Sequence, residues 1–483
     1  MTMMILLSLL LPLLIGALLV QVLLPAPTDP PSSSSATLTA VWKLCLAPGA
    51  GFALVSLLYF LWSLIFSPRQ GLAGYLMLES LLLLGLGVYA WRQARPAGPA
   101  LHLKKHTGIR LLAILAGMVF VLFLLNFLAQ WHKLAFEKPF GDWDAWAIWN
   151  LRAAFIASGD EWLKGFSPVI LWSHPDYPLL LPLNVARVWA LLGERSVLAP
   201  VILGLLFQLL LVGLLATSVR LQRGALQGWL AGILGIAVIM VSLNFHQYAD
   251  IPLAYYFLAA NVLLFMGDTL TGRESGPALL AGLMTGAALW TKNEGWALLM
   301  AVIAVRLLID LVSRRPLAQS ARGFGFFLLG LLPLLLATLY FKLSLAPPND
   351  ILGNLSIAAI KSKLVEVSRY LTILKAARNQ FIHYGDLILP MLPLLLVYGI
   401  LVGTSYPKEQ RSSILALLLR VATIIGVYFM IYLLTPNNLA WQLNTSLERL
   451  ITHILPSALF SYFLVVSTLN PQSKLGTLNE ETA

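Results

Sequence analysis

Long apolar runs separated by short polar segments make up almost all of this sequence. A helix needs about twenty consecutive apolar residues to cross a bilayer. The pattern therefore predicts an all-α polytopic membrane protein with about thirteen transmembrane helices. We expect these spans at 4–24, 48–66, 72–91, 109–131, 196–218, 225–244, 251–268, 277–291, 295–312, 323–345, 386–403, 412–434 and 451–467.

Two other segments have a mixed pattern that favours the membrane interface. Residues 178–193 are apolar but short, and they contain Pro182, Asn184 and Arg187, so we interpret them as an interfacial helix. Residues 346–385 alternate basic and apolar positions, which is typical of an amphipathic segment. Contact with anionic headgroups and a solvated loop helix both remain open for it. Its basic residues are Lys361, Lys363, Arg369, Lys375 and Arg378.

Composition supports a membrane protein and excludes several classes. The chain has 483 residues, of which 59% are hydrophobic and 11% charged, whereas soluble domains carry about a quarter charged residues. The net charge is +11, and the basic residues lie in short loops between apolar runs. Cytoplasmic retention of Lys and Arg explains this distribution better than a nucleic-acid partner. Cys45 is the only cysteine, which excludes an internal disulfide and a cysteine-based metal site.

The loop charges also predict an orientation. If 178–193 does not span, the basic clusters all fall on one face, which the positive-inside rule assigns to the cytoplasm. The clusters lie at 92–110, Arg220 and Arg223, Arg273, Arg314 to Arg322, and Lys408 and Arg411. The opposite face then receives a large loop at 132–195 together with most of the remaining polar sequence.

Two motifs in that loop could carry acid–base chemistry. The first contains Asp142 and Asp144, spaced by a tryptophan, and carboxylates near a bilayer face can act as a general base or bind a divalent cation. Water-facing acids on an interfacial helix are an equally good interpretation. The second motif is His174-Pro-Asp-Tyr-Pro, whose histidine could donate to a phosphate or could lie in a solvated turn.

Three further polar positions interrupt or precede apolar runs. Asp250 comes directly before a span, where helix capping is the simpler explanation. Lys292 and Glu294 break a long apolar stretch, and charges at membrane depth are costly, so we expect them to pair or to line a cavity. Arg449 precedes the last span and could hold a phosphate, or could pair with Glu448 or a headgroup.

The order of these motifs resembles that of the GT-C glycosyltransferases, in the bacterial branch of protein O-mannosyltransferases and lipid A aminoarabinose transferases. The resemblance covers about residues 109–312, with looser support from 441–450. It runs from the Asp-Trp-Asp-Ala-Trp motif through His-Pro-Asp-Tyr-Pro and Tyr-Ala-Asp-Ile-Pro-Leu to Trp-Thr-Lys-Asn-Glu-Gly. It implies a GT-C-like fold in the bacterial inner membrane, with an active site that faces the periplasm.

The resemblance also implies a reaction and its residues. Such enzymes transfer a sugar, with inversion, from a polyprenyl-phosphate donor to a lipid, glycan or protein acceptor. Carried over, Asp144 is the expected base and Asp142 supports it. His174, Asp250, Lys292, Glu294 and Arg449 are the expected substrate-binding residues. The chain departs from the family where Asp176 replaces a second proline, where Asn-Glu-Gly follows Lys292, and where Asp-x-Asp replaces an Asp-Glu pair.

Three divisions of the chain follow: N-terminal helices without a derived role (1–108), a catalytic core that includes loop 132–195 (109–345), and a C-terminal part (346–483). No cofactor is required, although a divalent metal is compatible with the acidic motif. We expect Asp144, Asp250 and Lys292 to meet in one water-filled hollow. Rival hypotheses are a transporter or flippase for lipid-linked saccharides, which also predicts broken helices, and an O-antigen-type polymerase or ligase.

Overall fold

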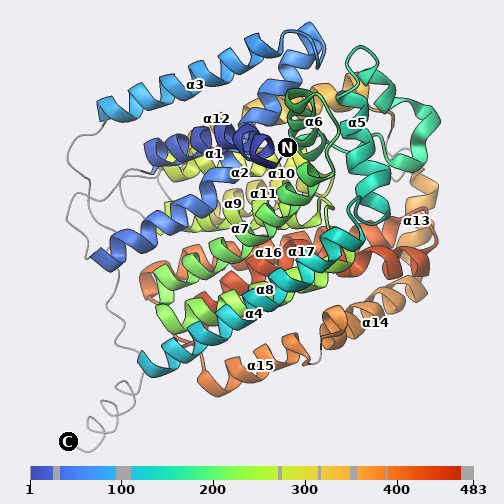
Figure 1. Cartoon of the computed structure of the whole chain (residues 1–483). Helices are drawn as coiled ribbons and strands as arrows, with labels where there is room; N and C mark the ends of the chain where they lie inside the picture. The colour runs from blue at the N-terminus through green and yellow to red at the C-terminus, as the bar shows by residue number, and fades with distance from the viewer. Residues whose placement is uncertain are drawn as a thin grey trace, which may run out of the picture.

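The chain is a bundle of long helices with short helices gathered at one end (Figure 1). The computed structural model describes residues 2–24, 33–93, 110–269, 275–313, 317–348, 356–387 and 389–468. Within these ranges regular structure is helical, apart from a single β-bridge between Thr404 and Val466. An all-α architecture is therefore confirmed. Several basic residues that support the predicted orientation, among them Arg95, Lys104, Lys105 and Arg273, lie outside the described ranges.

The helices have the following bounds. The first half of the chain forms α1 (Thr2–Leu23), α2 (Ser33–Phe66), α3 (Leu72–Gln93), α4 (Arg110–Glu137), α5 (Leu151–Ile156), α6 (Leu180–Leu192), α7 (Leu198–Arg223) and α8 (Ala225–Val241). The second half forms α9 (Asp250–Thr269), α10 (Ser275–Thr291), α11 (Gly295–Ser313), α12 (Leu317–Tyr340), α13 (Ile357–Val365), α14 (Val367–His383), α15 (Met391–Val402), α16 (Arg411–Leu434) and α17 (Leu439–Val465). Short 3₁₀ and π elements include η1 (Ala145–Asn150), η3 (Pro168–Ser173) and η5 (Phe341–Leu345).

The expected number of spans was too high. In the described part of the chain, nine helices are long and apolar enough to cross a membrane, or ten if α14 and α15 form one broken span. The nine lie in α2, α3, α4, α7, α8, α9, α11, α12 and α16, where α8 is extended to Asn244 and α12 to Leu345. The protein is thus a multi-pass membrane protein by helix length and composition.

The four predicted spans that fail are short or polar. The apolar part of α1 covers only Ser8–Leu23, α10 has 17 residues and α15 has 12. The predicted span 451–467 is the second part of α17, a 27-residue helix whose first half carries Glu448 and Arg449. The apolar runs located these helices, but run length did not show where each helix begins and ends.

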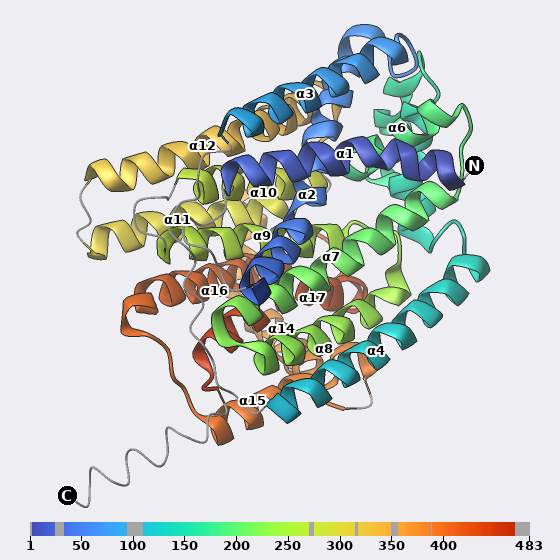
Figure 2. The same cartoon turned by 60° about the vertical axis from the view of Figure 1, so that its left-hand side comes forward.

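Helix α9 lies at the centre of the bundle, while α3 and α4 lie at its periphery. Every residue of α9 from Asp250 to Leu263 is buried, whereas α3 and α4 expose most of their apolar side chains. Figure 2 shows α3 and α4 on opposite outer sides, with α9 between α7, α10 and α16. The exposed leucine and phenylalanine side chains of the outer helices are those that a bilayer would cover.

Two glycines allow α10 and α12 to approach closely. A β-carbon on Gly282 of α10 would lie 1.9 Å from the carbonyl oxygen of Phe327 in α12, and one on Gly330 would lie 1.9 Å from that of Leu279. Small residues at such crossings let membrane helices pack backbone to backbone. This packing fixes α10, and with it the polar segment that follows Thr291.

The predicted interfacial helix at 178–193 is instead packed into the protein. Helix α6 has 13 residues, which is too short to span, and its residues from Leu180 to Ala190 are all buried. Arg187 of α6 forms a buried ion pair with Glu79 of α3, and its Nη1 donates to the carbonyl oxygen of Ser8 at 2.7 Å. Helices α1 and α3 therefore hold α6, which lies within the loop at 132–195, in place.

Two basic residues of 346–385 cap the C-terminal end of a helix. Lys363 Nζ donates to the carbonyl oxygens of Leu434 and Thr435 at 3.0 and 2.7 Å. Arg369 donates to those of Leu433 and Tyr432 at 2.9 and 3.0 Å. Cations at a helix C-terminus satisfy unpaired carbonyls and oppose the helix dipole. Helices α13 and α14 are thus held against the end of α16.

Candidate functional site

Asp250 is the centre of a buried charge cluster at the end of the bundle where the short helices gather. Its side chain has no solvent exposure. Oδ1 accepts from Lys292 Nζ at 3.0 Å and from Arg449 Nε at 3.2 Å, and lies 2.7 Å from His453 Nε2. Oδ2 accepts from Arg449 Nη2 at 2.9 Å. Residues of α17 and of the break after α10 therefore meet at the carboxylate that begins α9, and this carboxylate does far more than cap α9.

Arg449 connects this cluster to the large loop. Its Nη2 donates to Asp144 Oδ2 at 2.7 Å as well as to Asp250, so one nitrogen bridges the two acids. The guanidinium also lies over the ring of Tyr248, 4.9 Å from its centroid, and the Tyr248 hydroxyl accepts from the backbone N–H of Asp144 at 3.2 Å. Asp144 is thereby fixed through both its side chain and its backbone.

Asp142 points elsewhere, although only one residue separates it from Asp144. It accepts from Lys138 at 2.7 Å and faces His246 Nδ1 at 3.8 Å. The turn between Lys138 and Asp142 requires Gly141, whose φ is +74° and whose added β-carbon would lie 2.4 Å from Cβ of Ala145. The expected support of Asp144 by Asp142 is therefore not seen as a contact.

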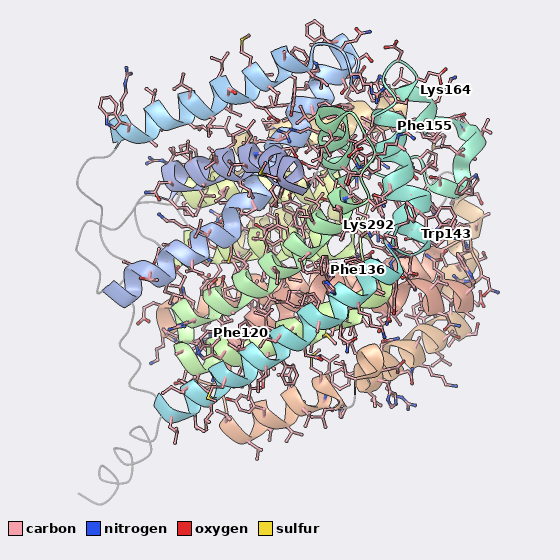
Figure 3. All side chains as sticks on the ribbon, viewed as in Figure 1. Phe120, Phe136, Trp143, Phe155, Lys164 and Lys292 are labelled. Carbon is pink, nitrogen blue, oxygen red and sulfur yellow. The ribbon has the colours of Figure 1, made fainter. Side chains whose placement is uncertain are left out.

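The polar break between α10 and α11 supplies the lysine. Lys292 is buried and lies between Asp250 and Glu294, whose Oε1 is 3.1 Å away. The backbone turns here because the N–H of Gly295 donates to the carbonyl oxygen of Lys292 at 2.9 Å. Figure 3 shows Lys292 at the end of the bundle that carries the segments of Trp143, Phe155 and Lys164. Lys292 and Glu294 thus pair with each other, which is one of the two alternatives considered from the sequence.

A second polar group adjoins the first and centres on Asp176. Its Oδ2 accepts from Asn293 Nδ2 at 2.8 Å and from Lys342 Nζ at 3.1 Å. Asn293 stands between Lys292 and Glu294, so the same break serves both groups. Asp176 thus ties the His-Pro-Asp-Tyr-Pro motif to the break and to η5. From the sequence, Asp176 was notable only as a departure from the family pattern.

His174 is held outside the Asp250 cluster by aromatic stacking. Its ring lies parallel to that of Tyr177, with centroids 5.2 Å apart, and Tyr177 stacks on Trp149 at 5.5 Å. Buried Arg152 donates to the backbone carbonyl oxygens of His174 and Ser173. Burial, together with nearby Glu294 and Asp176, raises the pKa of Tyr177 well above its usual range. Tyr177 therefore remains a neutral hydroxyl between the two acidic groups.

His453 is the main residue of the site that was not predicted from the sequence. It is fully buried, and its Nδ1 lies 3.2 Å from the Tyr428 hydroxyl while Nε2 faces Asp250. It lies four residues after Arg449 in α17, which places both on one helix face. A histidine within an apolar run was an available signal, because ionisable residues at membrane depth are usually functional.

Only the outer edge of the cluster reaches solvent. Asp250 and His453 have no exposed side-chain surface, whereas Asp144, Glu294 and Arg449 retain 15%, 17% and 20%. An incoming substrate would therefore meet Asp144, Glu294 and Arg449 first. Among the described residues, no group of three or more histidine, cysteine, aspartate or glutamate side chains is arranged to hold a metal ion.

The cluster combines the partly exposed carboxylate of Asp144 with two cations, Lys292 and Arg449, that pair with the buried Asp250. Asp144 can accept a proton, and Arg449 and Lys292 can oppose a developing negative charge. The chain was compared with family models, curated proteins and solved structures, and none of them matches it. The family resemblance therefore rests on the motifs alone, while the membrane character rests on the helices.

Proposed function

We propose that this protein is an integral membrane glycosyltransferase that uses a polyprenyl-phosphate sugar, with Asp144 as its general base. The observation that carries the proposal is the bridge by which Arg449 joins Asp144 to Asp250. It brings together two acids and an arginine, a side chain suited to phosphate, from segments far apart in the chain. The GT-C-like fold, the periplasmic site and the bacterial inner membrane belong to the same proposal.

The reaction follows from the chemistry of these groups. Asp144 removes the proton from an acceptor hydroxyl as its oxygen forms a bond to the anomeric carbon. The bond from that carbon to the phosphate oxygen breaks, and the phosphate leaves with the electron pair. Attack from the face opposite the phosphate inverts the configuration. Arg449 and Lys292 stabilise the charge that develops on the leaving oxygen.

Substrate binding has to redistribute the charges seen here. Three carboxylates (Asp144, Asp250 and Glu294) share two cations, Lys292 and Arg449. A donor phosphate would compete with Asp144 for Arg449, because guanidinium binds phosphate and carboxylate through the same fork of donors. Withdrawal of Arg449 from Asp144 frees Asp144 Oδ2 to accept a proton. Donor binding would thereby activate the base.

The test compares Asp144→Asn with Asp142→Asn at matched expression in membranes. Transfer is measured from a panel of radiolabelled polyprenyl-phosphate monosaccharides, and donor binding is measured separately. We expect Asp144→Asn to lower transfer by about 10²–10⁴-fold with donor binding retained. Asp142→Asn is the matched control and should keep most of the activity. Equal activity of Asp144→Asn and wild type with every active donor would reject Asp144 as the base.

A transporter of lipid-linked saccharides is the second candidate, favoured by the break between α10 and α11. Transporters place charged residues at such interrupted helices near the membrane midplane. The break here lies instead at the end of the bundle, beside the loop that contains Asp144. Reconstituted protein that flips a fluorescent polyprenyl-linked sugar without transferring it would favour this candidate over the enzyme.

A further inference from the structure

Tyr177 lies where the two polar groups of the site meet. It follows Asp176, whose Oδ2 accepts from Asn293 Nδ2 at 2.8 Å, and Asn293 directly precedes Glu294. This hydrogen bond brings the backbone of Tyr177 beside the break that carries Glu294. The charged residues that act electrostatically on the Tyr177 hydroxyl are Glu294, Asp176, Arg449 and Asp144. The hydroxyl therefore lies among the residues that a substrate would meet first.

The ring of Tyr177 is fixed in position by its neighbours. It stacks on His174 with an interplanar angle of 14° and on Trp149 with an angle of 13°. Trp149 is buried, and buried Arg152 donates to the backbone carbonyl oxygen of His174 at 3.2 Å. A side chain that is already locked by packing loses little further freedom when it binds a ligand. The Tyr177 hydroxyl is thus well placed to contact one.

The hydroxyl at the end of this fixed ring is unused. Tyr177 is partly exposed, and within the described residues its hydroxyl has no hydrogen-bond partner. Other tyrosines near the cluster do have partners. The Tyr428 hydroxyl lies 3.2 Å from His453 Nδ1, and the Tyr432 hydroxyl lies 2.9 Å from Ser446 Oγ. Tyr177 therefore keeps both a donor and an acceptor available.

Glu294 offers a second unused atom. Its Oε1 lies 3.1 Å from Lys292 Nζ, whereas Oε2 is buried without a hydrogen-bond partner among the residues that the structure describes. An unpaired buried carboxylate oxygen is costly, so it calls for a partner that completes it. The side chain is 17% exposed, and the terminal torsion of a glutamate turns easily, so Oε2 can reach a ligand. A hydrogen-bond donor on Tyr177 thus lies near an acceptor on Glu294.

We propose that one hydroxyl group of the transferred sugar binds between these two side chains, accepting from the Tyr177 hydroxyl and donating to Glu294 Oε2. This inference rests on the proposed glycosyl transfer and names the residues that would select the sugar. A sugar hydroxyl both donates and accepts, so it satisfies both atoms at once. The phosphodiester of the donor only accepts, and beside Tyr177 it would be repelled by the nearby carboxylates. The phosphate therefore belongs to Arg449 and Lys292, and the sugar to Tyr177.

The test uses the full chain in detergent and measures binding of polyprenyl-phosphate sugars and of bare polyprenyl phosphate. Tyr177→Phe removes only the unpaired hydroxyl, so we expect unchanged thermal stability and unchanged binding of bare polyprenyl phosphate. The sugar donor that the wild type binds most tightly should bind about 10–100-fold more weakly. Tyr406→Phe, at an exposed tyrosine before α16, is the matched control and should change neither. Equal weakening of both ligands would assign Tyr177 to the phosphate and overturn the proposal, as would unchanged binding of the donor.

Monodeoxy analogues of that sugar identify the hydroxyl group. One analogue should bind the wild type about 10–100-fold more weakly than the parent donor, and Tyr177→Phe should cause no additional loss with that analogue. A loss of the same size with every analogue would overturn the hydroxyl contact. Transfer is measured in parallel to separate the two proposals. Transfer by the wild type with an unaltered sugar preference in Tyr177→Phe rejects this inference alone, whereas no transfer from any donor rejects the proposed function.

Discussion

His453 Nε2 lies 2.7 Å from Asp250 Oδ1, and neither side chain is exposed to solvent. The other ring nitrogen lies 3.2 Å from the Tyr428 hydroxyl, so the imidazole is held from both sides. This contact orients the Asp250 carboxylate toward Lys292 and Arg449. The cluster is consequently a fixed part of the helix bundle, onto which the loop that carries Asp144 is attached.

Removal of the Asp250 carboxylate should destabilise the protein strongly. Asp250→Ala leaves Lys292 and Arg449 without their shared buried partner, and such losses cost about 3–5 kcal/mol. We expect a clear fall in the midpoint of heat-induced aggregation in detergent. Asp142→Ala is the control, because its pair with Lys138 is partly exposed and worth about 0–1 kcal/mol. Similar midpoints for the two variants would contradict a structural role for Asp250.

Arg449→Lys tests the bridge rather than the charge. Lysine keeps the positive charge but has a single nitrogen, so it cannot reproduce the fork by which Nε and Nη2 hold Asp250 while Nη2 also binds Asp144. On the proposed function, we expect transfer to fall about tenfold or more, with the larger effect on donor KM. A matched Arg220→Lys change lies away from the cluster and should have no effect. Wild-type kinetics in Arg449→Lys would show that only charge matters.

Apolar side chains should be able to replace the buried ion pair of Glu79 and Arg187 with most of the stability retained. Glu79→Gln alone leaves the Arg187 guanidinium buried and uncompensated, at a cost of about 3–5 kcal/mol. The double change Glu79→Leu with Arg187→Met removes both charges and should recover most of that loss. Thermal stability of purified protein measures both. A double variant less stable than Glu79→Gln would show that the pair contributes more than mutual neutralisation.

Acidification should loosen the contact between α4 and the segment before α9. His246 Nε2 donates to the Lys138 carbonyl oxygen at 3.0 Å, and burial lowers the pKa of His246 below its ordinary value of 6.5. The opened segment therefore takes up a proton more readily than the closed one, so stability is full above about pH 6.5 and falls below it. Asp142 and Lys138 are the charged groups that face this ring.

Hydrogen exchange of residues 138–144, corrected for intrinsic rates, measures this effect. Protection should be lower at pH 5.5 than at pH 7.5 in the wild type, and the difference should shrink in His246→Gln. A pH difference that persists unchanged in the variant would assign the effect to other groups.

The sequence predicted the helical membrane class and most of the polar residues that meet. Charges in an apolar chain stand out, so Asp144, Asp250, Lys292, Glu294 and Arg449 were visible as candidates. Their mutual contacts were not visible, because each pairs with a residue on another helix. The separate directions of Asp142 and Asp144 depend on the turn at Gly141 and the start of η1, which composition does not reveal.

Helix ends and distant ion pairs were the other features beyond sequence reasoning. Lys363 and Arg369 suit an amphipathic interfacial segment equally well, and only the position of the end of α16 shows that they cap it. Arg187 was noted as a polar residue in a short apolar run, but its partner Glu79 lies in another helix, α3. Such pairs are set by tertiary packing, which local patterns do not encode.

The position of Arg449 in α17 has a consequence for how the protein is made. Synthesis proceeds from the N-terminus, so Asp250 and Lys292 enter the membrane before Arg449 and His453 leave the ribosome. During that interval Lys292 is the only one of these three partners available to Asp250. The charged centre is therefore completed only when α17 packs against α9, and a ribosome that stalls before α17 leaves Asp250 with one of its three partners.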